Sequence, residues 1–465
     1  MPEYQCDVYS DGGDSPPSKG FRDLPDELLL EIMTRLEVIR AYEPQSTAWS
    51  WHNWVGEGIR QGINQERQRT LHAICLTSRR LRRIATPILY AAFTGTSTWK
   101  GIEHLKSFHR TVSNREATVA HGVPFSKHLR YIENRLSDHY GNSLYKDTAG
   151  YDTMQMTARY FYLLAEIVKL APNLQHLCVV SLETEEISFW KHIMASAQTA
   201  DPAVNSTMSF SKLETLCFQI NTSAFRRRSG EVWFAHIFST MASVPLLKEL
   251  RACGVMSNNN APVALATPLA PFRKLQRLEI TKCLLDFDEI VDLWQACTGL
   301  QHITCEWAYL DCTTELPSDL LPGLLRHAET LQTLHLDLRE VRFDLPRPPA
   351  PPLFGSLRAF VNLRSLTVCE RFTSDDHYTW DGRIAHLLPF SLEDLNVLRH
   401  PDGLFEFGSH EDRIRNLRRL AEDCQVVLPH LKRVAIHDLA EFHCSELQTL
   451  FTTAGVQFDI VREIV

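Results

Sequence analysis

The residue types that could support chemistry are most crowded near the C-terminal end, in the stretch HDLAEFHC at 437–444. His437, His443 and Cys444 are all potential zinc ligands, but a structural zinc site gathers four ligands at closer spacings. The rest of the chain contains no G-x-S-x-G nucleophile turn, no G-x-x-x-x-G-K-[ST] phosphate loop and no H-E-x-x-H helix. We therefore expect no catalytic residues, no metal and no cofactor, and we predict a protein that is not an enzyme.

Composition limits the class of protein further. The 465 residues carry a formal net charge of −8, which argues against a broad surface for nucleic acid. No apolar run approaches the roughly 18–20 residues that cross a bilayer, so no membrane partner is expected. Residues 1–20 are polar and lack a hydrophobic signal core, which predicts a disordered tail. The twelve cysteines are scattered without a C-x-x-C pair, and this pattern favours a cytoplasmic or nuclear protein.

A short phrase of the form Leu-x-x-Leu-x-apolar recurs along the chain from residue 170 onward, as in KLQRLEI. Such a phrase predicts a strand whose alternate side chains point to opposite faces. In that copy Leu278 and Ile280 would face a core, while Arg277 and Glu279 would face solvent. The leading leucines of the phrases are Leu174, Leu213, Leu247, Leu275, Leu300, Leu331, Leu363, Leu392 and Leu431, with a weaker copy at Leu129.

Amphipathic segments such as YFYLLAEIVKLA and FDEIVDLWQAC precede most of these phrases and predict helices. The acidic stretch DFDE at 286–289 is expected to begin the second of them. One helix–strand unit cannot bury its apolar face alone, whereas stacked neighbours can. The pattern resembles the long, helix-containing class of leucine-rich repeats. That resemblance implies an α/β solenoid, or horseshoe, of about nine or ten irregular helix–strand repeats, a number that uneven spacing leaves open by one or two.

The outward residues of the predicted strands form two candidate tracks for binding a target protein. Concave repeat surfaces commonly bind other molecules, although these positions could also be merely solvated. The first track contains Arg277, His302, Thr333, Ser365, Asp394 and Arg433. The central track contains Cys178, Cys217, Arg251, Glu279, Thr304, His335, Thr367, Asn396 and Ala435. The candidate target contacts among them are Arg251, Arg277, Glu279, His302, Thr304, His335, Thr367 and Asn396.

The N-terminal stretch LPDELLLEIMTRLE predicts a short helix with a broad apolar stripe. Pro25 suits a first helical turn, and the acidic residues after it complement the helix dipole. A second stretch, ICLTSRRLRRIATPILY, predicts another amphipathic helix, which Pro87 is expected to end. Its arginines, within residues 79–83, are expected to be solvated. The stripe of the first helix comprises Leu28, Leu29, Ile32, Met33 and Leu36.

Together the two stretches resemble the F-box, a small three-helix module that opens with Leu-Pro and closes with a Ser-Arg-x-hydrophobic-Arg helix and a Pro-x-Leu-Tyr tail. The resemblance implies that an exposed apolar face docks onto the Skp-type linker protein, and through it the cullin, of an SCF-type ubiquitin ligase. The repeats would then hold an unidentified target protein for ubiquitination. The implied linker-binding residues are Leu24, Pro25, Leu28, Ile32, Leu36, Leu76, Leu81, Pro87, Leu89 and Tyr90.

The resemblance divides the chain into a tail at 1–20, an F-box module at 21–93 and a repeat domain at 94–465. An insertion at 38–69 lengthens the module and could leave the docking face intact or cover it. Its tryptophans could pack internally or contact a partner. The apolar helix could likewise pack on the first repeats. The implied function is that of a substrate-recognition adaptor, and the alternative is a leucine-rich-repeat interaction scaffold that acts outside ubiquitination.

Overall fold

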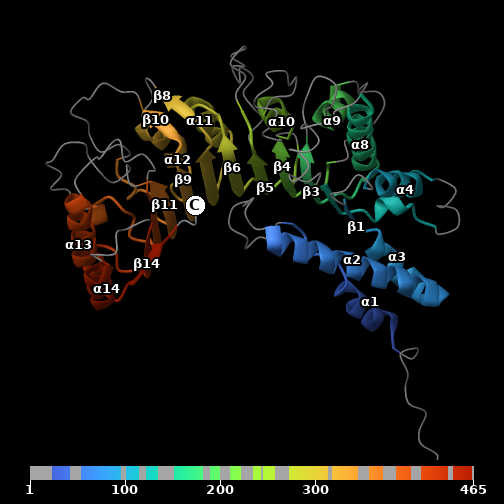
Figure 1. The fold of residues 1–465 in the computed structure, drawn as a ribbon, viewed down its shortest axis with the longest axis horizontal. Coiled ribbons are helices and arrows are strands. Elements are labelled where there is room, and N and C mark those ends of the chain that lie inside the picture. The colour runs from blue at the N-terminus through green and yellow to red at the C-terminus, as the bar shows by residue number, and fades with distance from the viewer. Residues whose placement is uncertain are drawn as a thin grey trace, which may run out of the picture. The chain divides into compact units, whose positions relative to one another are not determined.

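The computed structural model describes most of the chain, and Figure 1 shows its fold as a ribbon. The described residues are 24–41, 54–95, 101–114, 122–134, 151–181, 189–198, 210–220, 234–241, 244–256, 272–312, 317–343, 355–369, 384–399, 410–437 and 444–462. They belong to two compact units. The first contains Val55–Ala91 with the segment up to Ile39, and the second contains Arg40–Trp54 and the chain from Ala92 onward. No described helix is long and apolar enough to cross a membrane.

The first unit consists of three helices, α1 (Asp26–Thr34), α2 (Trp54–Thr77) and α3 (Arg79–Leu89), whose apolar sides meet in a small core. Ser78 separates α2 from α3. Its Oγ accepts a hydrogen bond from the Leu81 amide at 3.1 Å and so caps the N-terminus of α3. The buried core residues are Leu29, Met33, Leu71, Cys75, Ile84, Ala85 and Ile88.

The predicted helix end at Pro87 is wrong, because α3 continues through this proline to Leu89. A proline inside a helix removes one backbone donor, the one that would reach the carbonyl four residues earlier. The bonds that follow are intact, and the Tyr90 amide donates to the Thr86 carbonyl at 3.0 Å. Since Pro87 stands in the last turn, the helix ends two residues later instead of at the proline.

Three of the four arginines of α3, Arg79, Arg82 and Arg83, are exposed as the sequence predicts, and Arg80 is partly buried. Arg80 Nε donates to Asp26 Oδ1 at 2.7 Å, and Arg83 pairs with the other oxygen of the same carboxylate. Arg82 Nε donates to the Cys75 carbonyl at 3.0 Å. The hydrogen bond from Arg80, the larger influence, and the one from Arg83 hold the pKa of Asp26 below its ordinary value. These contacts tie the N-terminus of α1 to the start of α3.

Part of the predicted insertion at 38–69 is helical, because α2 begins at Trp54. Asn64 on this helix holds the chain that leaves α1. Its Oδ1 accepts from the Ile39 amide at 2.7 Å, and its Nδ2 donates to the Ile39 carbonyl at 2.9 Å. The other two tryptophans of the insertion, Trp49 and Trp51, lie outside the described residues.

The second unit is built on a sheet of 12 strands that follow one another in chain order (Figure 1). Each strand is parallel to its neighbours. The strands are β1 (Ala92–Thr94), β2 (Tyr131–Asn134), β3 (His176–Ser181), β4 (Thr215–Ile220), β5 (Glu249–Cys253), β6 (Arg277–Cys283), β7 (His302–Trp307), β9 (Thr333–Asp337), β11 (Ser365–Cys369), β12 (Asp394–Leu398), β13 (Arg433–His437) and β14 (Gln457–Val461). A separate parallel pair joins β8 (Leu310–Cys312) to β10 (Val341–Phe343). The unit is therefore of the mixed α/β class.

Helices connect many of the successive strands and lie along one face of the sheet (Figure 1). The helices of this unit are α4 (Gly101–Ser113), α8 (Tyr151–Leu170), α9 (Phe189–Gln198), α10 (Phe234–Met241), α11 (Phe287–Gln295), α12 (Leu321–Leu325), α13 (His410–Val427) and α14 (Cys444–Thr453), with short 3₁₀ turns η2 (Phe125–Lys127), η4 (Pro317–Leu320) and η6 (Ile384–His386). The predicted helix start at 286–289 is confirmed. The Glu289 carboxylate accepts a hydrogen bond from the Asp286 amide at 3.0 Å, which closes the first turn of α11.

The leading leucine of each predicted phrase lies two residues before a strand, and its side chain is buried. The series runs from Leu129 ahead of β2 to Leu431 ahead of β13. These leucines join the strand and helix residues in one continuous core. The sheet also contains β1 and β14, which the phrase did not predict, because Tyr90 and Gly455 stand where the leading leucine would be.

Replacing a leading leucine should destabilise the second unit. Leu300 is fully buried ahead of β7, so Leu300→Ala should lower the free energy of unfolding by about 2–5 kcal/mol through lost contacts and a cavity. Leu325→Ala removes the same atoms from a half-exposed position on α12 and should cost less than about 1 kcal/mol. Urea unfolding followed by tryptophan fluorescence measures both variants. Equal losses would contradict the placement of Leu300 in the core.

Candidate functional site

The side of the sheet opposite the leucine core, which we name the polar face, carries the two predicted tracks. Parallel strands in register place equivalent outward side chains in rows. The first track forms one row: Arg277, His302, Thr333, Ser365, Asp394 and Arg433. The central track forms the next row: Cys178, Cys217, Arg251, Glu279, Thr304, His335, Thr367, Asn396 and Ala435. The predicted alignment of both tracks is confirmed, and their role in binding a target stays a prediction.

The expectation that outward residues are solvated is wrong for the central row at β5 and β6. Arg251 and Glu279 are only 1% and 2% exposed. Arg251 lies 3.1 Å from Glu249 and 3.4 Å from Glu279, and Arg277 Nη1 donates to Glu279 Oε1 at 2.8 Å. Buried charges persist in proteins when they are paired in this way. The same register that aligns the rows therefore brings opposite charges on neighbouring strands together.

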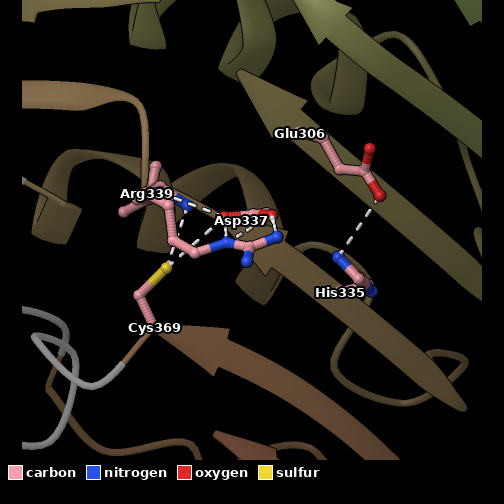
Figure 2. Close-up of polar contacts among 6 residues, drawn as sticks. Glu306, His335, Asp337, Arg339 and Cys369 are labelled. Carbon is pink, nitrogen blue, oxygen red and sulfur yellow. Dashed lines mark hydrogen bonds and ion pairs between the residues drawn. The ribbon is translucent and has the colours of Figure 1, made fainter. Parts of the chain in front are cut away.

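A second group of titratable side chains lies at the C-terminal ends of β7, β9 and β11 (Figure 2). Glu306 Oε1 lies 3.5 Å from Nε2 of His335. Arg339 donates three side-chain hydrogen bonds to Asp337, two from Nε at 3.0 Å and one from Nη2 at 2.7 Å. The Cys369 thiol donates to Asp337 Oδ1 at 3.7 Å. We name these five residues the Glu306 cluster.

The cluster has unusual proton affinities. Burial, with a further contribution from the negative charge of Asp337, raises the pKa of Glu306 from 4.5 to about 7. Burial lowers the pKa of His335 from 6.5 to about 4. Burial also opposes the ionised form of Asp337, but the hydrogen bonds from Arg339 outweigh it and hold the pKa of Asp337 below its ordinary value. At neutral pH His335 is therefore uncharged, and Glu306 is close to half-protonated.

The sequence analysis named His335 but missed Glu306, Asp337 and Arg339. Glu306 and Asp337 are paired directly in the register of β7 with β9, one outward position beyond Thr304 and His335. Extending the central track by two residues along the strands would have found both carboxylates. Arg339 lies after the end of β9, where no strand periodicity applies.

The other predicted target contacts on β7, β11 and β12 carry no charge at neutral pH. His302 Nδ1 lies 3.2 Å from the hydroxyl of Thr333, and burial lowers the pKa of His302 to about 4. Thr304 and Thr367 lie at the border of burial, and Asn396 is half-buried. On the side of β11 and β12 these predicted contacts near the Glu306 cluster are therefore neutral, whereas on the other side Lys282 and Glu279 of β6 are close enough to influence the pKa of Glu306.

The first unit exposes apolar side chains on α1. Leu28 and Ile32 are 46% and 47% exposed, whereas Leu29 and Met33 are buried in the three-helix core. Residues four apart lie on the same side of a helix, so Leu28 and Ile32 are neighbours there. The predicted single stripe is therefore divided into two apolar faces, one buried within the unit and one exposed.

The remaining predicted linker-binding residues fall into two groups. Pro25 and Leu76 are exposed, and Leu76 is 66% exposed near the end of α2. The others are partly buried: Leu24, Leu36, Leu81, Pro87, Leu89 and Tyr90. Of these, the leucines pack against the core of the unit itself. A partner could therefore touch Leu28, Ile32 and Leu76 without disturbing the three-helix core.

Among the described residues, no three His, Cys, Asp or Glu side chains are placed to hold a metal ion. In the stretch at 437–444, residues 438–443 lie outside the described part of the chain. No family model matches the sequence, and no curated protein matches it. The arguments for function therefore come from the apolar face of α1 and the polar face of the sheet.

Removing the buried cation of the central row should be costly. Arg251→Ala leaves Glu249 and Glu279 without their shared partner, and we expect the free energy of unfolding to fall by about 3–5 kcal/mol. Arg433→Ala is the matched control, because its ion pair with Asp459 is half-exposed and should contribute about 1 kcal/mol or less. Urea unfolding at neutral pH compares them. A loss no larger for Arg251→Ala than for Arg433→Ala would show that the buried network is not needed for stability.

The raised pKa of Glu306 predicts a stability that depends on pH. The folded chain binds this proton more tightly than the unfolded chain, so the stabilisation is complete below pH 4.5 and is lost as pH rises through about 7. Glu306→Gln stays neutral and should therefore gain about 3 kcal/mol relative to the parent between pH 4.5 and pH 8. Thermal and urea unfolding across this range test the gain. Asp394→Asn, which removes an exposed carboxylate on β12, should show no such gain; a pH-independent difference for Glu306→Gln would contradict the assignment.

Proposed function

We propose that this protein is the substrate-recognition adaptor of an SCF-type ubiquitin ligase. In this proposal the first unit is an F-box that docks onto the Skp-type linker, and through it onto the cullin. The second unit is a leucine-rich-repeat horseshoe that holds a target protein. The chain itself catalyses nothing. Tethering raises the effective concentration of target lysines near the charged ubiquitin carrier.

The observation that carries the proposal is the exposed apolar face of α1. A helix in a small three-helix unit needs one apolar side for its own core, and Leu29 and Met33 supply it. Leu28 and Ile32 add a second apolar side that the unit does not cover. Burying such side chains in a partner contributes roughly 1.5–3 kcal/mol each before association costs. The exposed pair therefore supports docking of a partner.

The second unit supports the other half of the proposal. Its strands repeat in chain order, ten of them preceded by a buried leucine, and its polar face presents charged and neutral groups in regular rows. Repeat surfaces of this kind bind extended partners because each repeat adds equivalent positions. The alternative, an interaction scaffold outside ubiquitination, would use the same polar face but would not need the exposed face of α1.

Binding to the linker is the direct test. The purified full-length chain should co-elute with a purified Skp-type linker on size exclusion. The double variant Leu28→Asp with Ile32→Asp should weaken the complex by more than tenfold, because each aspartate would have to be desolvated in the interface. Isothermal titration calorimetry gives the affinities, and circular dichroism shows whether the variant remains folded.

The control places the same two changes on exposed aliphatic residues of the second unit. Val361→Asp with Val426→Asp alters side chains that are 61% and 84% exposed and should leave linker binding unchanged. No complex with the folded parent would overturn the ubiquitin-ligase proposal and favour the scaffold. Equal weakening by both double variants would mean that the face of α1 is not the docking surface.

A further inference from the structure

The polar face contains a partly buried carboxylate that has no cationic partner of its own. Its salt bridges are Arg251 with Glu249 and Glu279, Arg277 with Glu279, Arg339 with Asp337, and Arg433 with Asp459. Within the described residues, the titratable group at salt-bridge distance from Glu306 is His335, at 3.5 Å (Figure 2). His335 is neutral at physiological pH because burial lowers its pKa to about 4.

The nearby cations do not neutralise Glu306. Arg339 and Lys282 both lower its pKa, but burial and Asp337 raise it more. Arg339 is committed to Asp337 through three side-chain hydrogen bonds. The Glu306 side chain is nevertheless 25% exposed, so a group from another molecule can reach it.

In the Glu306 cluster and next to it, on β9 and β12, two orphaned atoms point to the same kind of ligand. His335 Nε2 is buried and makes no hydrogen bond with any described residue, and the same is true of Asn396 Oδ1. Asn396 lies two strands further along the central row, with Thr367 between them. Buried polar atoms normally have a partner. An amide oxygen accepts hydrogen bonds, and so does Nε2 of a neutral imidazole whose proton is on Nδ1, so with His335 in that tautomer a ligand that supplies donors satisfies both atoms.

The charges decide between a cationic and an anionic ligand. An anionic group, such as a phosphate on a peptide, would have to displace a carboxylate from one of the paired arginines. A cationic group would meet Glu306 without breaking any existing salt bridge. It would also supply the donor that the acceptor atoms of His335 and Asn396 lack.

We propose that the polar face from β7 to β12, along the central row and the adjoining Glu306 cluster, binds an extended basic segment of the target protein, with a lysine or arginine side chain seated against Glu306 and His335. The identity of the segment as part of a target rests on the proposed function, whereas the binding site does not. Adjacent strands lie about 4.8 Å apart, so the two strand steps from His335 to Asn396 span about three residues of an extended chain. One short segment can therefore reach both positions.

The proposed site predicts that ligand affinity depends on the protonation of Glu306. A cation beside Glu306 favours its ionised form, so binding near neutral pH should release a proton. The affinity should consequently rise as pH increases through 7. An exposed carboxylate would show no such rise over this range, which separates the proposed site from general attraction to an acidic surface.

Fluorescence anisotropy with two labelled peptides tests the proposal on the full-length chain, without linker. The probe is the hexapeptide Ala-Arg-Ala-Arg-Ala-Arg, and its twin carries citrulline, which is neutral and nearly isosteric, in place of each arginine. The parent should bind the arginine peptide at least about tenfold more tightly than the citrulline peptide, as expected for a charge-assisted contact. Its affinity for the arginine peptide should also increase several-fold from pH 6 to pH 8.

Two variants complete the experiment. Glu306→Gln should lose most of the preference for arginine and all of the pH dependence, while Glu103→Gln, which removes the same charge from an exposed site on helix α4 away from this face, should keep both. Equal binding of the two peptides by the parent, absence of binding, or equal losses in the two variants would each overturn the proposal. Peptide binding without linker docking would refute only the ubiquitin-ligase role, and linker docking without peptide binding would refute only this site.

Discussion

In-register pairing of parallel strands is the constraint on which the second unit depends. Where strands pair in register, an outward side chain lies about 4.8 Å from its neighbours in the row, so its position is coupled to the equivalent positions of the adjacent strands. On one face this coupling stacks the leucines into a continuous core. On the other face it places charged side chains next to one another. Neighbouring charges of opposite sign stabilise the sheet, and neighbouring charges of the same sign destabilise it.

The rows satisfy this constraint in one region and violate it in another. Arg251 and Glu279 are directly opposed and oppositely charged, which allows both to be buried. Glu306 and Asp337 are also directly opposed but carry the same sign. Arg339, from beyond the strand, compensates Asp337, and Glu306 responds by binding a proton more tightly. The raised pKa of Glu306 is therefore a consequence mainly of its burial, with a further contribution from the like charge that strand register places opposite it.

The same constraint determines which parts of this structure can be predicted from the sequence. The leucine phrases predict ten strands and their register because a buried position tolerates few alternatives, whereas β1 and β14 lack the leucine and were missed. The burial of Arg251 and Glu279 could not be predicted from the hydrophobic pattern, because that pattern assumes that every charged side chain faces solvent. Glu306 was missed because the tracks stopped one outward position short of it. The break between α2 and α3 at Ser78, and the continuation of α3 through Pro87, depend on capping and on position within a turn, which periodicity does not encode.

The two places proposed to bind partners share a physical property. Most of each unit obeys local rules: apolar groups are buried and buried charges are paired. Leu28 and Ile32 break the first rule in the first unit, and Glu306 breaks the second rule in the second unit. Departures of this kind lower the stability of the isolated chain. They are expected at binding sites, where contact with another molecule removes the unfavourable exposure or the unpaired charge. An exposed apolar surface is stabilised when a partner excludes water from it, which suits a stable docking contact. A carboxylate with a pKa near 7 is stabilised in its ionised form only by a cation, so its contact depends on the charge of the ligand and on pH.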